Sequence, residues 1–473
     1  MTALLIDFGS TYTKLRAVDL DPPRVIASGQ GPSTVTTDVS IGMDLALQDL
    51  EQRLGRLPRF THRLACSSAA GGLRMVTVGL VRELTAEAAR QAALGAGARL
   101  VGTFVQRLTR SDLGAIEALD PDILLLAGGT DGGNSEAILH NAAGLAGSSL
   151  CCPVIVAGNR AASDEVEDLL RAAGKSATVT ANVMAEFGEL NIEPARDAIR
   201  RVFIDRIVHA KGIDRAAGRF DALLMPTPAA VLEGARLLAE GAGNEAGVGP
   251  LMVIDIGGAT TDVHSIGAGD PTESGVIVHG LPEPYAKRTV EGDLGMRHSA
   301  AAILEAAGVD VIATDARLDG NEVTRQVTAL AGDIEHLPQN DAERALDLAL
   351  ARNAVKLAVK RHAGTIQTVY TATGPALVQR GKDLRTARRV IGTGGVLAHG
   401  NDAGFILRGA LFDPADSQSL RPRQPKLLLD DQYILYAAGL LARVDEPAAV
   451  ALAKTHLTAL NEDPNDGRST ATG

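Results

Sequence analysis

Two short segments of this chain carry the same arrangement of an aspartate, glycines and hydroxyl side chains. Residues 5–15 read LIDFGSTYTKL, and residues 253–263 read VIDIGGATTDV. In each segment an apolar run ends at an aspartate, and a glycine-containing turn and a hydroxyl-rich return follow. Glycines let a backbone approach a ligand closely, and exposed amides and hydroxyls donate hydrogen bonds to phosphate. Each segment therefore predicts a β-hairpin whose turn can hold phosphate.

The two copies together predict a site that binds a nucleotide from both sides. Asp7 and Asp255 occupy equivalent positions. We expect them to orient a hydrated Mg²⁺ through its water shell, because Mg²⁺ dehydrates reluctantly. A single aspartate could instead cap a turn, but two copies favour the metal site. The residues expected to line the phosphates are Gly9, Ser10, Thr11, Thr13, Gly257, Gly258, Thr260 and Thr261.

Two charged residues beside these turns have alternative interpretations. Lys14 either neutralises phosphate charge or is a solvated strand lysine, and Asp262 either belongs to the phosphate site or lies on the surface. A third glycine-rich segment, IGTGGVLAHG at 391–400, supplies Gly392, Gly394 and Gly395. These glycines would let adenine and ribose pack against the backbone at the start of a helix. The alternative is a plain strand-to-helix turn.

The elements that position these residues alternate between strand and helix patterns, which predicts an α/β fold. We expect 24–28 to add a strand to the first hairpin and 276–279 to be a third strand in the second half. The apolar run at 122–127 is typical of a parallel strand buried on both faces. Residues 123–134 resemble 390–401, which indicates an internal duplication, although strand–glycine–helix units are common in α/β proteins.

The length of 473 residues allows two domains with large cores. We expect residues 1–240 to form the first domain, with an inserted α/β segment, and residues 251–430 to form the second. The glycine-rich stretch 241–250 is expected to be a flexible connector. Residues 431–461 would be helices that return to the core, and residues 462–473 a disordered tail.

Composition excludes several classes of partner. The net charge of −11 and the pI near 5.5 argue against binding to a nucleic-acid backbone. No uncharged apolar run reaches about 18 residues, so no membrane span is expected. Three cysteines without metal-type spacing and the absence of a signal peptide fit a reducing cytoplasm. The sequence does not indicate an oligomeric state.

The motifs and their order resemble the actin, sugar-kinase and heat-shock-chaperone ATPase superfamily. DFGSTYTK and DIGGATTDV look like its two phosphate motifs, and IGTGGVLAHG looks like its adenosine motif. PTPAAVLEGARLL at 226–238 and LDDQYILYAAGLL at 429–441 resemble its two connecting helices. The resemblance implies two ribonuclease-H-like domains that flank a nucleotide cleft binding ATP and Mg²⁺.

Within that superfamily the chain resembles the MutL/GlmL-type accessory proteins of glutamate mutase. The phrases that carry this likeness include SSAAGGLRM, LLAGGTDGGN, VIDIGGATTDVHS and EGDLGMRHS, spread along most of the chain. The resemblance implies a reactivating chaperone, a slow ATPase, that supports a coenzyme-B12-dependent mutase such as glutamate mutase. The sequence itself shows no cobalamin chemistry. A small-molecule kinase and a non-catalytic actin-like assembly protein remain alternatives.

One position departs from the chaperone pattern. Chaperone relatives carry a glutamate that places the attacking water, whereas this chain has Met225 before Pro226-Thr227. A thioether cannot act as a base. Either another carboxylate serves or hydrolysis is slow, and the candidate carboxylates are Asp131, Glu291 and Asp293, each of which could instead be a loop or capping residue.

Overall fold

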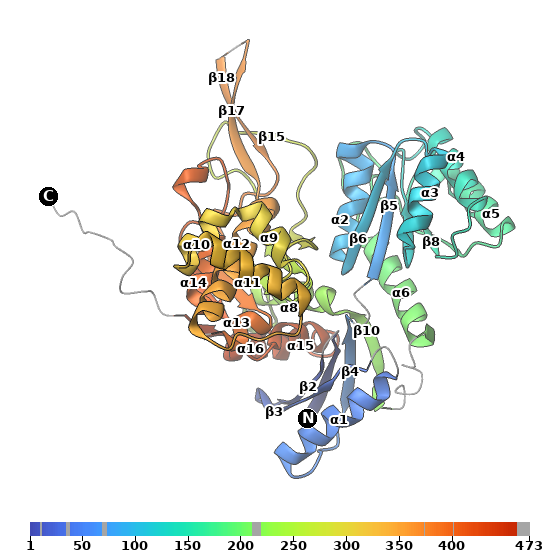
Figure 1. The fold of residues 1–473 in the computed structure, drawn as a ribbon. Coiled ribbons are helices and arrows are strands. Elements are labelled where there is room, and N and C mark those ends of the chain that lie inside the picture. The colour runs from blue at the N-terminus through green and yellow to red at the C-terminus, as the bar shows by residue number, and fades with distance from the viewer. Residues whose placement is uncertain are drawn as a thin grey trace.

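Two central sheets with the same strand order lie at the centre of the computed structural model (Figure 1). The structure describes residues 1–9, 12–34, 38–68, 73–210, 219–372, 374–400 and 402–460. The first sheet has the order β10-β4-β1-β2-β3. Its strands are β1 (Thr2–Phe8), β2 (Tyr12–Leu20), β3 (Pro23–Pro32), β4 (His62–Ser67) and β10 (Ala222–Pro226).

The second sheet repeats this arrangement and adds one short strand, giving the order β16-β14-β13-β19-β20-β21. In both sheets the first three strands form an antiparallel meander, and the next two run parallel to the first strand. The strands are β13 (Leu251–Ile256), β14 (Thr261–Ile266), β16 (Ala286–Glu291), β19 (Arg389–Thr393), β20 (Lys426–Leu429) and β21 (Thr458–Ala459). The chain thus contains two ribonuclease-H-like domains, as the sequence predicts.

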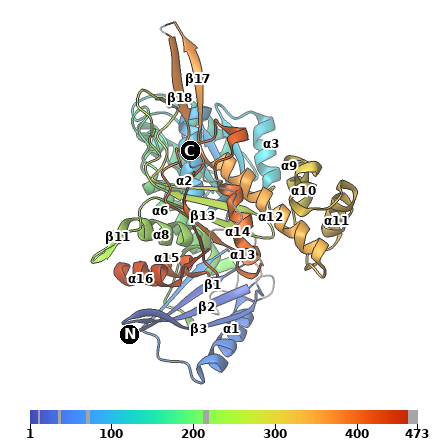
Figure 2. The ribbon, with the colours of Figure 1, turned by 90° about the vertical axis from the view of Figure 1, so that its left-hand side faces the viewer.

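Helices cover these sheets and connect them. α1 (Val39–Leu54) packs on β3, and α8 (Thr227–Glu240), α15 (Ile434–Leu441) and α16 (Glu446–His456) lie between the two sheets (Figure 2). α8 follows β10 directly, and a proline in its first turn is tolerated because that amide needs no partner. The second sheet is covered by α9 (Ala300–Ala307), α10 (Val309–Ala316), α11 (Gly320–Gly332), α12 (Asp341–His362), α13 (Gly395–His399) and α14 (Ala403–Leu407).

A separate parallel sheet is inserted between β4 and β10 and forms its own lobe (Figure 1). Its order is β6-β5-β7-β8-β9, and its central strand β7 is fully buried, as the apolar run predicts. The strands are β5 (Leu73–Gly79), β6 (Ala98–Val105), β7 (Ile123–Leu126), β8 (Val154–Val156) and β9 (Ala177–Val179). The helices are α2 (Glu87–Gly95), α3 (Arg110–Leu119), α4 (Glu136–Ala146), α5 (Ser163–Ala172) and α6 (Glu193–Ala210), and a π-helical turn spans Arg82–Ala86.

Residues 276–279 contain a strand, as expected, but it lies outside the second central sheet, and two further expectations about the fold are wrong. The third strand of the second sheet is β16, whereas β15 (Ile277–His279) joins a projecting sheet with β17 (Thr365–Thr371) and β18 (Gly374–Arg380) (Figure 1). The likeness of 123–134 to 390–401 does not mark a duplication, because the counterpart of β19 beside the first strand is β4, not β7. The stretch 241–250 contains a short hairpin, β11 (Gly241–Ala242) and β12 (Glu245–Ala246).

The structure does not test the predicted domain boundaries or the predicted disordered tail. The domain boundaries remain predictions, and the tail 462–473 lies outside the described residues. Within the described residues, no helix combines the length and apolar character that a membrane crossing needs.

Short 3-10 turns occur at Arg160–Ala162, Arg408–Ala410 and Pro414–Asp416.

Candidate functional site

The first hairpin places Asp7 at the buried end of β1. The side chain of Asp7 is 5% exposed, and the Thr227 hydroxyl, at the start of α8, donates to its Oδ1 at 2.6 Å. The Gly9 amide donates to the Tyr12 carbonyl at 3.1 Å and closes the turn. A Cβ at Gly9 would lie 2.6 Å from that carbonyl oxygen, so this close approach requires glycine. Thr13 is buried on β2, and Ser10 and Thr11 lie outside the described residues.

The second hairpin places Asp255 opposite Asp262 across β13 and β14. The Gly257 amide donates to the Thr260 carbonyl at 2.9 Å, which closes the turn. Gly258 is exposed at the tip, and a Cβ there would meet only Arg297 side-chain carbons, at 3.9 Å or more. The turn is therefore open on its outer side. The Thr261 hydroxyl is buried and donates to the Leu294 carbonyl at 2.6 Å, so it supports the fold of the turn from below.

The third glycine-rich segment lies against the second hairpin. Gly394 has a φ of 100°, and a Cβ there would lie 2.8 Å from Asp255 Oδ1. Gly392 pairs with Ile254 in the sheet and packs inward, since a Cβ there would meet Leu397 and Leu407 side chains. Gly395 begins α13 and faces the Tyr433 hydroxyl, 3.7 Å from the Cβ position. Gly394 thus lies against the Asp255 carboxylate and Gly395 near the Tyr433 hydroxyl, whereas Gly392 faces the core.

Lys14 extends from the first hairpin toward the second half of the chain. Its Nζ lies 3.5 Å from the centre of the Tyr433 ring, a cation–π contact between β2 and the start of α15. Its positive charge lowers the pKa of both Asp7 and Asp255, against the effect of their burial. Lys14 is therefore not a simple solvated strand residue, because it lies near both carboxylates and contacts an aromatic ring.

Negative charge accumulates between the two hairpins. Burial raises the pKa of Asp255 to about 7, and the carboxylates of Asp262, Asp7 and Asp430 add to the effect. Burial also raises the pKa of Asp7, and that of Asp430 to about 6. Such a site favours a proton or a cation. Within the described part of the chain, no three side chains converge as direct ligands, and a Mg²⁺ that keeps its waters needs fewer.

Asp262 is buried and paired, so the alternative of a surface residue is wrong. Its Oδ1 accepts from Arg288 Nε at 2.7 Å and also pairs with the Nη2 of the same guanidinium. Its Oδ2 accepts from the Thr260 hydroxyl at 3.2 Å, which links it to the turn. Asp262 therefore supports the turn of the second hairpin through Thr260 and places its carboxylate opposite Asp255.

The three candidate bases are all bound to other groups. Asp131 accepts from the Arg160 amide and the Asn182 side chain at 2.9 Å, within the inserted sheet's loops. Glu291 and Asp293 both bind Arg361, which holds the pKa of Asp293 below its usual value, while burial raises that of Glu291. Asp131 thus has the loop role left open by the sequence, and Glu291 and Asp293 are both paired with Arg361.

Three residues of the site were missed from sequence alone. Thr227 binds Asp7, Tyr433 contacts Lys14, and Asp430 accepts from the amides of Ile434 and Leu435 at 2.6 and 3.1 Å at the start of α15. Their signal was present in the Pro-Thr step before one connecting helix and in the LDDQY run before the other. Neither pattern shows which hairpin its side chains meet.

Comparison with known proteins identifies the family of this chain. A family model described as "MutL protein" matches residues 3–457. The chain belongs to the MutL family. Its similarity to "Protein MutL" of Clostridium tetanomorphum is 47% identity over 455 residues, which covers 96% of this chain and 98% of that protein.

Solved structures show more distant likenesses to this MutL-family chain. A glycerol dehydratase reactivase is 12% identical with a TM-score of 0.34, covering 94% of this chain and 99% of its own. The xylulose kinase of Bifidobacterium adolescentis is 13% identical with a TM-score of 0.32, covering 98% and 96%. At such TM-scores these likenesses add no argument to the strand order described above.

Proposed function

We propose that this MutL-family chain binds Mg-ATP between its two hairpins. The observation that carries the proposal is the approach of Asp7, Lys14 and Asp255, from the equivalent hairpins of two domains with one strand order, in a single buried and negatively charged region. The turn is open at Gly258, where phosphate would approach the backbone, and Gly394 and Gly395 lack side chains beside Asp255 and Tyr433, where adenosine would pack. Asp7 and Asp255 would hold the Mg²⁺ through water, and the metal would neutralise the carboxylates and the phosphates.

We further propose that bound ATP serves an accessory role, with slow hydrolysis. Met225 is buried and cannot activate water, which favours slow turnover. The client proposed from the sequence resemblance is a coenzyme-B12-dependent carbon-skeleton mutase such as glutamate mutase. Nucleotide-dependent closure of the two domains would alter the surface offered to this client.

The nucleotide site is tested by calorimetry. The double variant Asp7→Ala/Asp255→Ala should lose Mg²⁺-dependent ATP binding, because both water-mediated carboxylates are gone. The matched control is Asp164→Ala, an exposed aspartate on α5 of the inserted lobe, which should bind as the parent does. Circular dichroism checks that each variant is folded. Unchanged affinity in the folded double variant would rule out the assignment.

The accessory role is tested with an inactivated mutase. Purified chain, Mg-ATP and free adenosylcobalamin are mixed with glutamate mutase that holds cyanocobalamin, and mutase activity is followed. Recovery that requires ATP supports the proposal. A phosphorylated small metabolite would instead indicate a kinase, and ATP-dependent sedimentation of the chain alone would indicate an assembly protein.

A further inference from the structure

The turn between α2 and β6, Leu94–Ala98, lies where the inserted lobe meets the second central sheet. Arg288 on β16 is 4% exposed, and its Nη1 donates to the carbonyls of Leu94 at 3.1 Å and Ala98 at 2.8 Å. Leu94 belongs to the last turn of α2, where carbonyls lack partners within the helix and the helix dipole is negative. The guanidinium therefore binds this turn by both hydrogen bonds and charge.

The other edge of the same guanidinium reaches the candidate phosphate turn. Its Nε donates to Asp262 Oδ1 at 2.7 Å, and Asp262 Oδ2 accepts from the Thr260 hydroxyl at 3.2 Å. An unbroken chain of hydrogen bonds thus runs from the turn at 257–260 to the inserted lobe. Every side chain in it except that of Thr260 is buried, so a lost partner would leave a buried charge unpaired.

The first hairpin reaches the same turn by packing. Gly97 has a φ of 95°, and a Cβ there would lie 2.7 Å from Pro226 Cβ. Pro226 immediately precedes Thr227, whose hydroxyl binds Asp7. The Leu94–Ala98 turn is therefore in contact with groups next to both candidate phosphate loops.

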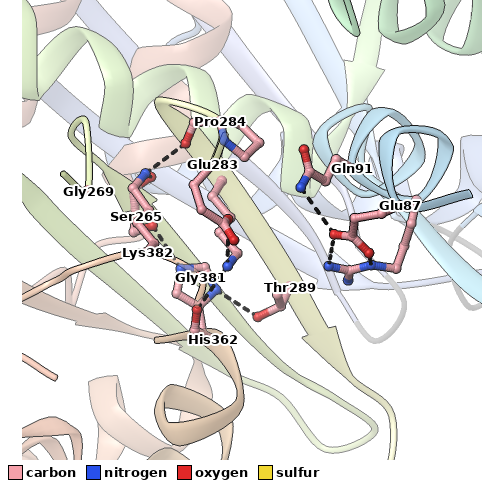
Figure 3. Close-up of polar contacts among 12 residues, drawn as sticks. Glu87, Gln91, Ser265, Gly269, Glu283, Pro284, Thr289, His362, Gly381 and Lys382 are labelled. Carbon is pink, nitrogen blue, oxygen red and sulfur yellow. Dashed lines mark hydrogen bonds and ion pairs between the residues drawn. The ribbon is translucent and has the colours of Figure 1, made fainter. Parts of the chain in front are cut away.

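The surroundings of the turn are tightly packed. α2 lies along β16, and Figure 3 shows Glu87 and Gln91 of α2 beside the strand that carries Thr289. Arg196 of α6 packs on Gly95, where a Cβ would lie 2.2 Å from its Nε, and its Nη2 donates to the Ala286 carbonyl at 3.3 Å. Because the turn is tightly packed, a displacement of Arg288 would move the whole turn.

We propose that the Leu94–Ala98 turn is the coupling element that transmits the nucleotide state of the cleft to the inserted lobe, with Arg288 as its positioning residue. This inference rests on the proposed nucleotide site. A phosphate bound at the turn competes with Asp262 for the hydrogen bond that the Thr260 hydroxyl donates. Asp262 then changes its orientation, and Arg288 changes its hold on the two carbonyls of the turn.

Hydrogen exchange measured by mass spectrometry tests this coupling in two arms. Without nucleotide, Arg288→Met should speed amide exchange in residues 87–105 by about tenfold or more, as expected when charge-assisted hydrogen bonds are lost. With Mg-ATP, the parent chain should change its exchange in 87–105, and Arg288→Met should not, although it still binds the nucleotide. Gly97→Ala, which strains the turn against Pro226, should also reduce the response.

The control is Arg421→Met, because Arg421 is an equally buried arginine of the second domain that binds Ser419 and Asp416 and not the turn. It should keep the nucleotide response at 87–105. Unchanged exchange in nucleotide-free Arg288→Met would overturn the inference even if the parent does not bind ATP. A parent that binds Mg-ATP with no change at 87–105 would overturn it and leave the proposed function standing. A parent that fails to bind Mg-ATP would overturn the proposed function and the nucleotide coupling with it, whereas faster exchange in nucleotide-free Arg288→Met would still show that Arg288 holds the turn.

Discussion

At the scale of single residues, Asp255 shows how neighbouring carboxylates raise the pKa of a group in the site. Its carboxyl is half-buried near three other carboxylates, and partial desolvation together with their charge raises its pKa from an ordinary 3.8 to about 7. The folded state therefore binds more protons than the unfolded state between these values. Stability falls as pH rises through this window, and the whole cost is present above pH 7.

Asp255→Asn should therefore make the nucleotide-free chain more stable at pH 8. The expected gain in unfolding free energy is about 2–4 kcal/mol, from a pKa shift of this size, and it should shrink toward acidic pH as the parent becomes protonated. Urea unfolding followed by circular dichroism at several pH values measures the difference. Asp164→Asn, at an exposed position, is the control and should show little change. Equal stabilities at pH 8 would contradict the buried, charge-crowded setting.

Gly394 gives a second prediction about a single position. Gly394→Ala would put a Cβ 2.4 Å from the Ile256 carbonyl oxygen at a φ of 100°, so it should cost about 1–3 kcal/mol of stability and weaken nucleotide binding. Gly395→Ala is the matched control, since the nearest atom to its Cβ is the Tyr433 hydroxyl at 3.7 Å. Urea midpoints compare the two, and equal losses would argue against the close contact at Gly394.

At the scale of elements, α12 is attached to the second sheet by His362. Its ring is fully buried, and it contacts the hydroxyls of Thr289 and Ser265 at 2.8 Å each (Figure 3). Burial lowers its pKa well below 6.5, and the charges of Lys287, Lys382, Arg90 and neighbouring His264 act in the same direction. The ring is therefore neutral in the folded chain.

His362→Gln should change how stability depends on pH. Because the folded pKa is depressed, the stability contributed by the neutral ring is present above the unfolded value of 6.5 and is lost as pH falls. At one pH unit below 6.5, the parent should lose about 1.4 kcal/mol relative to the glutamine variant. The readout is the difference in unfolding free energy between the two chains at pH 7.5 and 5.5. A constant difference would mean that the His362 ring takes up a proton in the folded chain as readily as in the unfolded chain.

The elements that the sequence predicts well are those whose pattern is local. The two hairpins repeat one motif, and β7 is a continuous apolar run, so both are visible in the sequence. β16 was missed because it carries Lys287 and Arg288, whose charges meet the His362 carbonyl and the Asp262 carboxylate, both far from β16 in the sequence. Hydropathy cannot show burial that depends on ion pairs with distant segments.

The residues of the candidate site divide in the same way, into those in a local sequence motif and those placed by contacts between distant segments. Asp7 and Asp255 stand out because each is written into a repeated motif. Thr227 and Tyr433 reach these hairpins only through the packing of helices that follow other strands. Arg288 and Leu94 of α2 are 194 residues apart in the sequence. No rule based on local spacing predicts this contact.

At the scale of the whole molecule, α8 and α15 connect the two domains by direct backbone contact. A Cβ at Gly234 would lie 2.2 Å from the Leu435 carbonyl oxygen, and one at Gly439 would lie 1.9 Å from that of Ala230. Figure 2 shows these helices between the two sheets. Because α8 follows β10 and α15 follows β20, this crossing is the natural pivot for any closure over a nucleotide.

Gly439→Ala should separate the two helices at this pivot and destabilise the chain by about 1–3 kcal/mol, the usual cost of overpacking. The same outward shift should move Tyr433 away from Lys14, so ATP affinity should fall together with stability. Gly114→Ala, on an exposed face of α3 with nothing within 4 Å, should instead leave binding unchanged and add a little stability. Urea unfolding and calorimetry on both variants decide the matter. If Gly439→Ala is destabilised yet binds Mg-ATP as the parent does, the helix crossing holds the domains together without setting the geometry of the cleft.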